Sequence, residues 1–363
     1  MKRNSGIDLL RLVLMLMVVV LHVLGQGGIL AAVEHNPIKY GVAWLLETSA
    51  YCAVNCYAMI TGYVYVGKKC KLSSVGMIWL QTWVYSLGIA ACAWVLKPDL
   101  FSWKVLSYFA FPVTNKAYWY VSAYIGLFIL IPLLNAGIEQ MTEAQMKKML
   151  MIAFVTTSVF PTLMKADPYI TNEGYSTIWL CLMYLIGASI KKYGWGQKVS
   201  GKRDIIIYVG CVVISWGWKL IKEALTGNMG QNIHLILYTS PTIVMAAVAL
   251  LLAFIQLEIP EKKENLIKRF APAAFGVYLI HVHEYVFGHY FRESFAFLAE
   301  KNVIVLVVGV LGLATLVFLG CLMVDYMRHL VFEWLKIKKL LIKFEEKLMK
   351  KTAFDENIHL GSM

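Results

Sequence analysis

The sequence predicts an all-α, polytopic membrane helix bundle of about ten transmembrane helices, with both termini in the cytoplasm. Of the 363 residues, 59% are hydrophobic and only 15% are charged, and the mean hydropathy is +0.64. This balance lies outside that of a water-soluble domain. Windows of about 20 apolar residues, the length that crosses a bilayer, recur along the chain, and the basic residues between them are distributed unequally between the two sides.

The first window follows Lys2 and Arg3 and so resembles a signal peptide, but Asp8, Arg11 and His22 interrupt it and no small-residue cleavage site follows. We therefore interpret it as the first membrane helix. Residues 100–112 are too short to span and are expected to lie in the membrane interface. The predicted helices cover residues 8–26, 42–66, 73–96, 117–136, 148–164, 175–190, 204–221, 233–256, 271–289 and 302–326.

The basic residues predict the topology. The net charge is +12, yet the lysines cluster between apolar segments and form no single stripe, so nucleic acid is not an expected partner. Of the 34 Lys and Arg, 24 fall on the side of the termini and nine on the other, with Arg11 inside the first helix. This bias predicts cytoplasmic termini in the plasma membrane. Residues 1–327 are the predicted membrane domain, and residues 328–363 are a basic amphipathic tail expected to lie on anionic lipid.

The seven cysteines lie in apolar stretches or a lysine-rich loop, so they predict neither a disulfide framework nor a metal site.

Arg11 and His22 are the most informative polar residues, because ionisable groups inside a membrane helix need a cavity or a partner. They are eleven residues apart, which places them on nearly the same helix face, about 16 Å apart along the axis. One face thus presents a cation near the cytoplasm and an imidazole in the outer half of the bilayer. This suits an anionic carrier that binds at the cytoplasmic mouth and presents its reactive end to a base. The alternative is a histidine bonded to a neighbouring helix and a snorkelling arginine.

Other polar residues of the predicted helices lie at related depths. Glu47 is expected roughly 8 Å below the outer surface and Asn55 near the midplane. His281 is expected near the midplane, with Glu284 about a turn beyond it. The carboxylate of Glu47 or of Glu284, placed beside His22, would orient the His22 ring and stabilise its protonated form.

Four segments in order resemble the acyltransferase-3 family of bacterial membrane O-acyltransferases. The opening KRNSGIDLLRLVLMLMVVVLHV is similar to the first family helix, with arginine, ten residues and then histidine. The second predicted helix ends in Thr61, Gly62 and Tyr63, where the family has Ser-Gly-aromatic. YWYVSAYIGLFILIPLLN resembles the family's Trp-aromatic-aliphatic-Ser-x-Tyr-Ile segment, and AFGVYLIHVHEYV resembles its Tyr-Leu-Ile-His segment.

The resemblance implies transfer of an acyl group, most often acetyl, from cytoplasmic acyl-CoA to a hydroxyl of an extracytoplasmic or lipid-linked glycan, with no permanently bound cofactor. Under this interpretation Arg11 and the basic loop hold the CoA phosphates, and His22 is the general base, although a covalent acyl-histidine stays open. The loop carries lysines where some members have arginines: Lys68, Lys69 and Lys71. Further candidates for hydrogen bonding to the substrate or lining its channel are Asn55, Thr61, Tyr63, Trp119, Tyr124 and His281.

A transporter or flippase of a cell-envelope saccharide is the main alternative, in which Arg11 and His22 mark a substrate path and no bond is made. The sequence shows neither a repeat between its halves nor paired Gly/Pro-broken helices, which would favour it. A structural or receptor-like protein would leave both residues without a task. The oligomeric state, the acyl chain length and the acceptor are not specified by the sequence.

Overall fold

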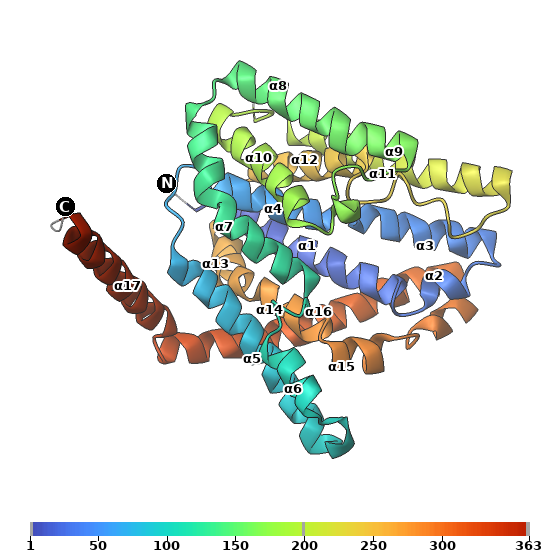
Figure 1. The fold of residues 1–363 in the computed structure, drawn as a ribbon. Helices are drawn as coiled ribbons and strands as arrows, with labels where there is room; N and C mark the ends of the chain where they lie inside the picture. The colour runs from blue at the N-terminus through green and yellow to red at the C-terminus, as the bar shows by residue number, and fades with distance from the viewer. Residues whose placement is uncertain (1–2, 198–199, 361–363) are drawn as a thin grey trace.

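The chain folds into a helical bundle in a computed structural model that describes residues 3–197 and 200–360 (Figure 1). Helix accounts for 78% of the structure, and no strand occurs among the described residues, which confirms the predicted all-helical class. The α-helices are α1 (Ser5–Leu24), α2 (Ile29–Ala32), α3 (Pro37–Ala50), α4 (Ala53–Tyr65), α5 (Leu72–Leu96), α6 (Trp103–Ala110), α7 (Trp119–Gln140), α8 (Glu143–Phe154), α9 (Phe160–Met164), α10 (Thr177–Tyr193), α11 (Gly201–Thr226), α12 (Pro241–Ile255), α13 (Glu261–Phe270), α14 (Ala274–His281), α15 (Glu284–Val286), α16 (Val303–Trp334) and α17 (Ile337–Leu360).

Five helices within the described ranges are long and apolar enough to cross a membrane: α1, α5, α7, α11 and α16. Ten spans and the cytoplasmic location of the termini stay predictions. Two of the predicted helices are interrupted, so their expected continuity is wrong: residues 42–66 break after Ala50, and residues 271–289 break at Val282. The helix predicted at 148–164 is continuous and contains a π-helical turn at Val155–Val159.

The breaks have local causes. Near the first one, the hydroxyls of Thr48 and Ser49 donate to the carbonyls of Trp44 and Leu46, and such bonds compete with the helical ladder. At the break after α14, the imidazole of His283 caps α15 by accepting from the Tyr285 N–H.

Helix α1 lies in the centre of the bundle, which places both Arg11 and His22 inside the protein. Leu10, Leu14 and Val23 are fully buried, and α1 packs against α3, α4, α12, α14 and α16. A Cβ atom on Gly6 would lie 1.9 Å from the carbonyl oxygen of Phe254. A glycine is therefore required where α1 meets the end of α12, as is common between membrane helices.

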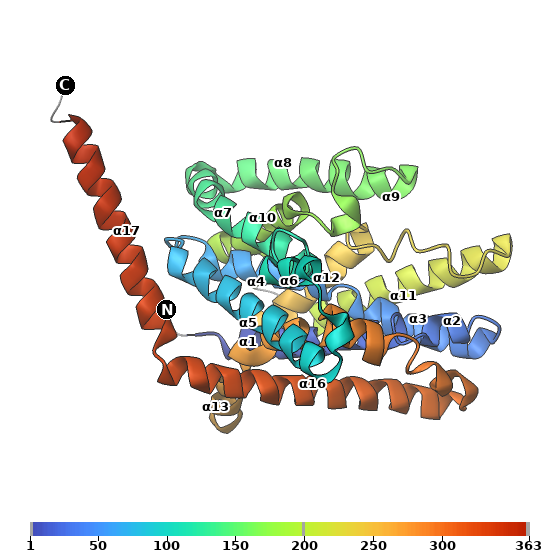
Figure 2. The same cartoon turned by 60° about the horizontal axis from the view of Figure 1, so that its bottom comes forward.

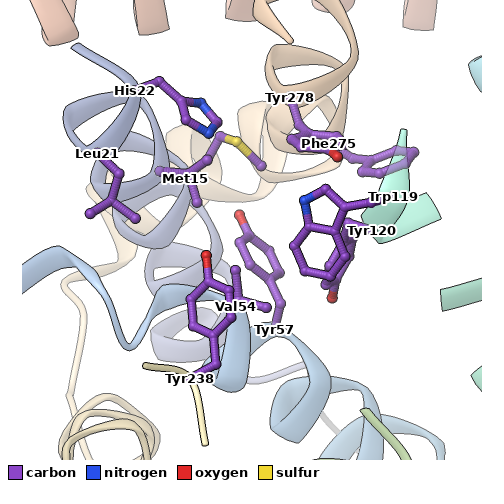
Figure 3. A pocket seen from close by; sticks show the side chains of 11 residues that line it. Met15, Leu21, His22, Val54, Tyr57, Trp119, Tyr120, Tyr238, Phe275 and Tyr278 are labelled. Carbon is purple, nitrogen blue, oxygen red and sulfur yellow. The ribbon is translucent and has the colours of Figure 1, made fainter. Parts of the chain in front are cut away.

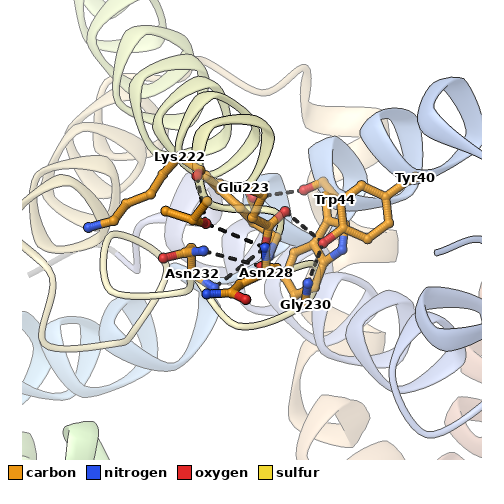
Figure 4. Close-up of polar contacts among 10 residues, drawn as sticks. Tyr40, Trp44, Lys222, Glu223, Asn228, Gly230 and Asn232 are labelled. Carbon is orange, nitrogen blue, oxygen red and sulfur yellow. Dashed lines mark hydrogen bonds and ion pairs between the residues drawn. The ribbon is translucent and has the colours of Figure 1, made fainter. Parts of the chain in front are cut away.

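A buried polar cluster holds the loop between α11 and α12 against α3 (Figure 4). Lys219 and Glu223, both fully buried, form an ion pair, and the Lys219 ammonium lies 3.8 Å from the centroid of the Trp44 ring. The Tyr40 hydroxyl donates to Glu223 over 2.8 Å and accepts from the Gly230 N–H over 2.9 Å. This clamp fixes the start of the loop that carries Tyr238 into the site described below.

The N-terminus and α17 lie at the same end of the bundle, and α17 runs crosswise to α16 (Figure 2). The segment expected in the interface forms the short helix α6, whose Trp103 and neighbouring Phe111 are exposed.

Candidate active site

His22, in the last turn of α1, meets His281, the last residue of α14. Its Nδ1 lies 2.8 Å from Nε2 of His281, and the ring centroids are 5.0 Å apart. The other nitrogen of His281, Nδ1, lies 2.6 Å from the carbonyl oxygen of Val277, one turn earlier in α14. His281 is fully buried, whereas His22 is half-buried.

This chain of hydrogen bonds assigns the tautomers. A carbonyl oxygen can only accept, so Nδ1 of a neutral His281 carries the proton and its Nε2 is an acceptor. The proton between the two rings then belongs to Nδ1 of His22, which leaves Nε2 of His22 with a free lone pair. A histidine held in this way is oriented as a general base.

His22 borders a cavity between α1, α4, α7 and α14, here named the reaction cavity (Figure 3). The ring projects into this space opposite the aromatic side chains of Tyr57, Trp119 and Tyr238. The lining residues are Met15, Val18, Leu21, His22, Val54, Tyr57, Trp119, Tyr120, Tyr238, Phe275 and Tyr278.

Two further cavities lie between the reaction cavity and the N-terminal end of α1. A middle cavity shares Tyr57, Tyr120 and Phe275 with the reaction cavity and is also lined by Arg11. A basic pocket shares Arg11 with the middle cavity. Neighbouring cavities therefore have lining residues in common, and the three lie in a row from the basic pocket to His22.

The basic pocket is lined by Arg3, Arg11, Lys68 and Lys191, with Asp8 as its acidic side chain. Asp8 is buried and pairs with both Arg3 and Arg11, the latter over 2.9 Å. Asp8 and Arg11 therefore form an ion pair at the pocket. The Arg11 side chain keeps 31% of its surface exposed, so part of the guanidinium can contact an anion in the pocket.

The structure separates the predicted basic residues. Lys68 lines the pocket, but Lys69 and Lys71 are exposed and lie outside its lining. Two basic residues of the pocket were not among the sequence candidates: Arg3, and Lys191, whose ammonium lies 4.8 Å from the ring centroid of Tyr63. Lys191 lies in the last turn of α10, on the predicted cytoplasmic side where Arg11 also lies. Its place at the cytoplasmic end of a predicted helix could have identified it.

The other predicted substrate contacts divide into lining and structural residues. Trp119 lines the reaction cavity, Tyr63 the basic pocket, and Thr61 and Tyr124 the middle cavity, where their hydroxyls lie 3.1 Å apart. Asn55 is buried and both ends of its amide are bonded: the nitrogen donates to the Tyr238 carbonyl over 2.8 Å, and the oxygen accepts from the Trp179 indole over 2.9 Å. Asn55 therefore positions Tyr238 and borders none of the three cavities.

Neither predicted carboxylate contacts His22. Glu47 is buried, but its Oε2 has no partner among the described residues and it does not line the reaction cavity. Glu284 is exposed at the start of α15. The break after His281 turns the chain, so Glu284 does not continue on the same helix face. The group that bonds to His22 is the imidazole of His281, for which the sequence predicted a substrate contact.

No group of three His, Cys, Asp or Glu side chains that could hold a metal ion occurs within the described ranges.

The comparisons with known proteins give one match. The model of the acyltransferase-3 family, described as an acyltransferase domain, matches residues 4–324. No curated protein and no solved structure matches the chain. The matched residues include Arg11, His22, Lys68, Lys191 and His281.

Proposed function

Because this chain belongs to the acyltransferase-3 family, we propose that it transfers an acyl group, in the simplest case acetyl, from cytoplasmic acyl-CoA to a hydroxyl of an extracytoplasmic or lipid-linked glycan. It acts in the plasma membrane with both termini in the cytoplasm. The observation that carries the proposal is the series of cavities that leads from the basic pocket to His22.

The basic pocket takes the phosphates of the donor. Three of its cations, Arg11, Lys68 and Lys191, come from three separate segments and converge on one space, as recognition of several phosphate groups requires. The narrow pantetheine arm then extends through the middle cavity, past Tyr57 and Tyr120, and places the thioester in the reaction cavity. The arrangement keeps the charged part of CoA out of the apolar interior, where it would be costly.

His22 acts as the general base. Its Nε2 accepts the proton of the acceptor hydroxyl while that oxygen forms a bond to the thioester carbonyl carbon. The carbon–sulfur bond then breaks, and the proton on His22 passes to the departing CoA sulfur, so His22 returns to its neutral state. His281 holds Nδ1 of His22 throughout and keeps Nε2 directed at the acceptor.

The tetrahedral intermediate carries a negative oxygen that needs a donor. Two residues that line the reaction cavity, Tyr120 and Tyr278, have buried hydroxyls that lack a hydrogen-bond partner among the described residues. Both are candidate donors, and an unpaired buried hydroxyl gains most from such a contact.

The test uses purified protein in lipid nanodiscs, radiolabelled acetyl-CoA and an envelope fraction as acceptor. Wild-type protein is expected to release CoA and move label into the glycan, whereas His22→Ala loses about 100-fold or more in rate. His35→Ala is the control, because His35 is exposed and outside the three cavities. Equal transfer by the His22 variant would overturn the role of His22. Saccharide movement across the membrane without CoA release would favour the transporter.

A further inference from the structure

Helix α17 is attached to the segment that begins α5. The carboxylate of Glu345 accepts the backbone N–H of Leu72 over 2.8 Å and that of Ser73 over 3.2 Å. These are amides of the first turn of α5, which have no partner within the helix. A Cβ atom on Gly76 would lie 3.5 Å from the side chain of Leu341, so α17 also packs closely on the next turn of α5.

The attachment lies next to the donor pocket. Lys71 is the N-cap of α5, and the same connection carries Lys68, which lines the basic pocket. The carbonyl of Lys68 accepts from Asn135 over 3.2 Å. The connection between α4 and α5 is therefore fixed from two sides, by α7 through Asn135 and by α17 through Glu345.

The outer faces of α17 have the pattern of a helix that lies on a membrane. Leu340 and Phe344 are 57% and 60% exposed and lie one turn apart. Lys339, Lys343 and Lys347, all exposed, form a second row. Each lysine comes one residue before a position of the apolar row, so the two rows lie about 100° apart around the helix. A helix with an apolar row beside a basic row can place its apolar side chains among the acyl chains of the lipid and its lysine ammonium groups at the anionic headgroups.

The position of α17 also suits binding to a membrane surface. It runs crosswise to α16 at the end of the bundle that carries the N-terminus (Figure 2), and α16 is long and apolar enough to span the membrane. A helix crosswise to a spanning helix lies along the bilayer surface.

We propose that α17 binds the anionic lipid surface of the cytoplasmic leaflet and thereby holds the α4–α5 connection in place through Glu345. The part of this proposal that concerns Lys68 and the donor rests on the proposed function. The lipid contact itself rests on the apolar and basic rows of α17. A protein of this kind is expected to order its donor pocket only when it is embedded in a charged membrane.

The experiment measures hydrogen exchange at the amides of Leu72 and Ser73 in the full-length protein. The protein is placed in nanodiscs of phosphatidylcholine alone or with roughly one third phosphatidylglycerol, a membrane that attracts juxtamembrane lysines. Each lysine near such a surface strengthens binding about fivefold. We therefore expect exchange to be slower by about fivefold or more in the anionic nanodiscs.

Matched variants locate the effect. Lys343→Gln/Lys347→Gln is expected to remove most of the lipid response, and Glu345→Ala to remove the protection in both lipids. Lys262→Gln/Lys263→Gln is the control, because it removes the same charge from exposed positions on α13 and should leave the response unchanged. Equal protection in both lipids, or a full response in the Lys343/Lys347 variant, would overturn the proposal. Hydrogen exchange does not depend on acyl transfer, so failure here is distinguishable from failure of the proposed function.

Discussion

Replacement of His281 by leucine tests the role of the imidazole that contacts His22. Leucine keeps an apolar side chain of similar size at a fully buried position, but it removes the 2.8 Å hydrogen bond to Nδ1 of His22. Removing one partner of a buried hydrogen bond and leaving the other unpaired costs about 1–3 kcal/mol. A loss of this size in the transition state corresponds to a fall of about 5- to 160-fold in kcat.

The assay follows CoA release under saturating acetyl-CoA, with KM for acetyl-CoA measured in parallel. Because His281 does not line the basic pocket, KM should change little. The double variant His22→Ala/His281→Leu should be no slower than His22→Ala, since residues that act as a unit are not additive. His283→Leu is the control: His283 is on the same chain break but bonds to the Ser86 carbonyl over 3.0 Å, away from His22. Additive losses, or an unchanged kcat for His281→Leu, would refute the reasoning.

Four further outcomes are expected. Lys191→Gln should raise KM for acetyl-CoA about 3- to 10-fold with little change in kcat. Lys71 lies outside the basic pocket, so Lys71→Gln should leave KM unchanged. Equal changes in KM for the two variants in steady-state kinetics would argue against a phosphate site at Lys191. Phe275→Trp should lower the rate of acyl transfer by narrowing the junction between the middle and reaction cavities, whereas Ile178→Trp, at an exposed position, should not. A normal rate for Phe275→Trp would contradict the donor route. Lys219→Met should lower the free energy of unfolding by about 3–5 kcal/mol, because it leaves the buried Glu223 carboxylate without its cation. Lys147 pairs with Glu143 at an exposed position, so thermal unfolding should show no such loss for Lys147→Met. Hydrogen bonds from Ser73 and Leu72, together with the charge of Lys71, lower the pKa of Glu345 below its usual 4.5, and the thiol of Cys70 also lies near this carboxylate. Protection of the Leu72 and Ser73 amides should therefore persist at neutral pH and disappear only as the pH falls below 4.5. A loss near pH 6 would be inconsistent with a carboxylate cap.

The sequence predicted those parts of the site that depend on one helix. Arg11 and His22 share a face of α1 because of helical periodicity alone, and their spacing indicated a cytoplasmic cation and a deeper base. The all-helical class followed from composition, and the apolar windows located α1, α5, α7, α11 and α16.

The partner of His22 could not be predicted from any single stretch of the sequence. His281 is 259 residues away in the sequence, and only the packing of α14 against α1 brings the rings together. Depth estimates suggested Glu47 and Glu284 because those estimates assumed straight, continuous helices. The break at Val282 invalidates that assumption for Glu284, which is exposed. Glu47 lies before the break after Ala50, and its buried side chain does not line the reaction cavity.

The basic pocket shows the same limit for charged residues. The lysines between α4 and α5 were predicted as one group, but only Lys68 lies in the lining. The contribution of Lys191 depends on the close approach of α10 and α4, where a Cβ atom on Gly187 would lie 1.9 Å from the Met59 carbonyl oxygen. Such an approach is a property of the packed bundle and has no counterpart in a single window of sequence.

The most direct test of the donor route is an electron cryomicroscopy structure of the protein in nanodiscs with a non-hydrolysable acetyl-CoA analogue. We expect density for the CoA phosphates at Arg11, Lys68 and Lys191, for the pantetheine arm beside Tyr57 and Tyr120, and for the acyl carbonyl in the reaction cavity next to Nε2 of His22. A bound analogue whose acyl group lies at the basic pocket, with the reaction cavity empty of ligand density, would contradict this expectation.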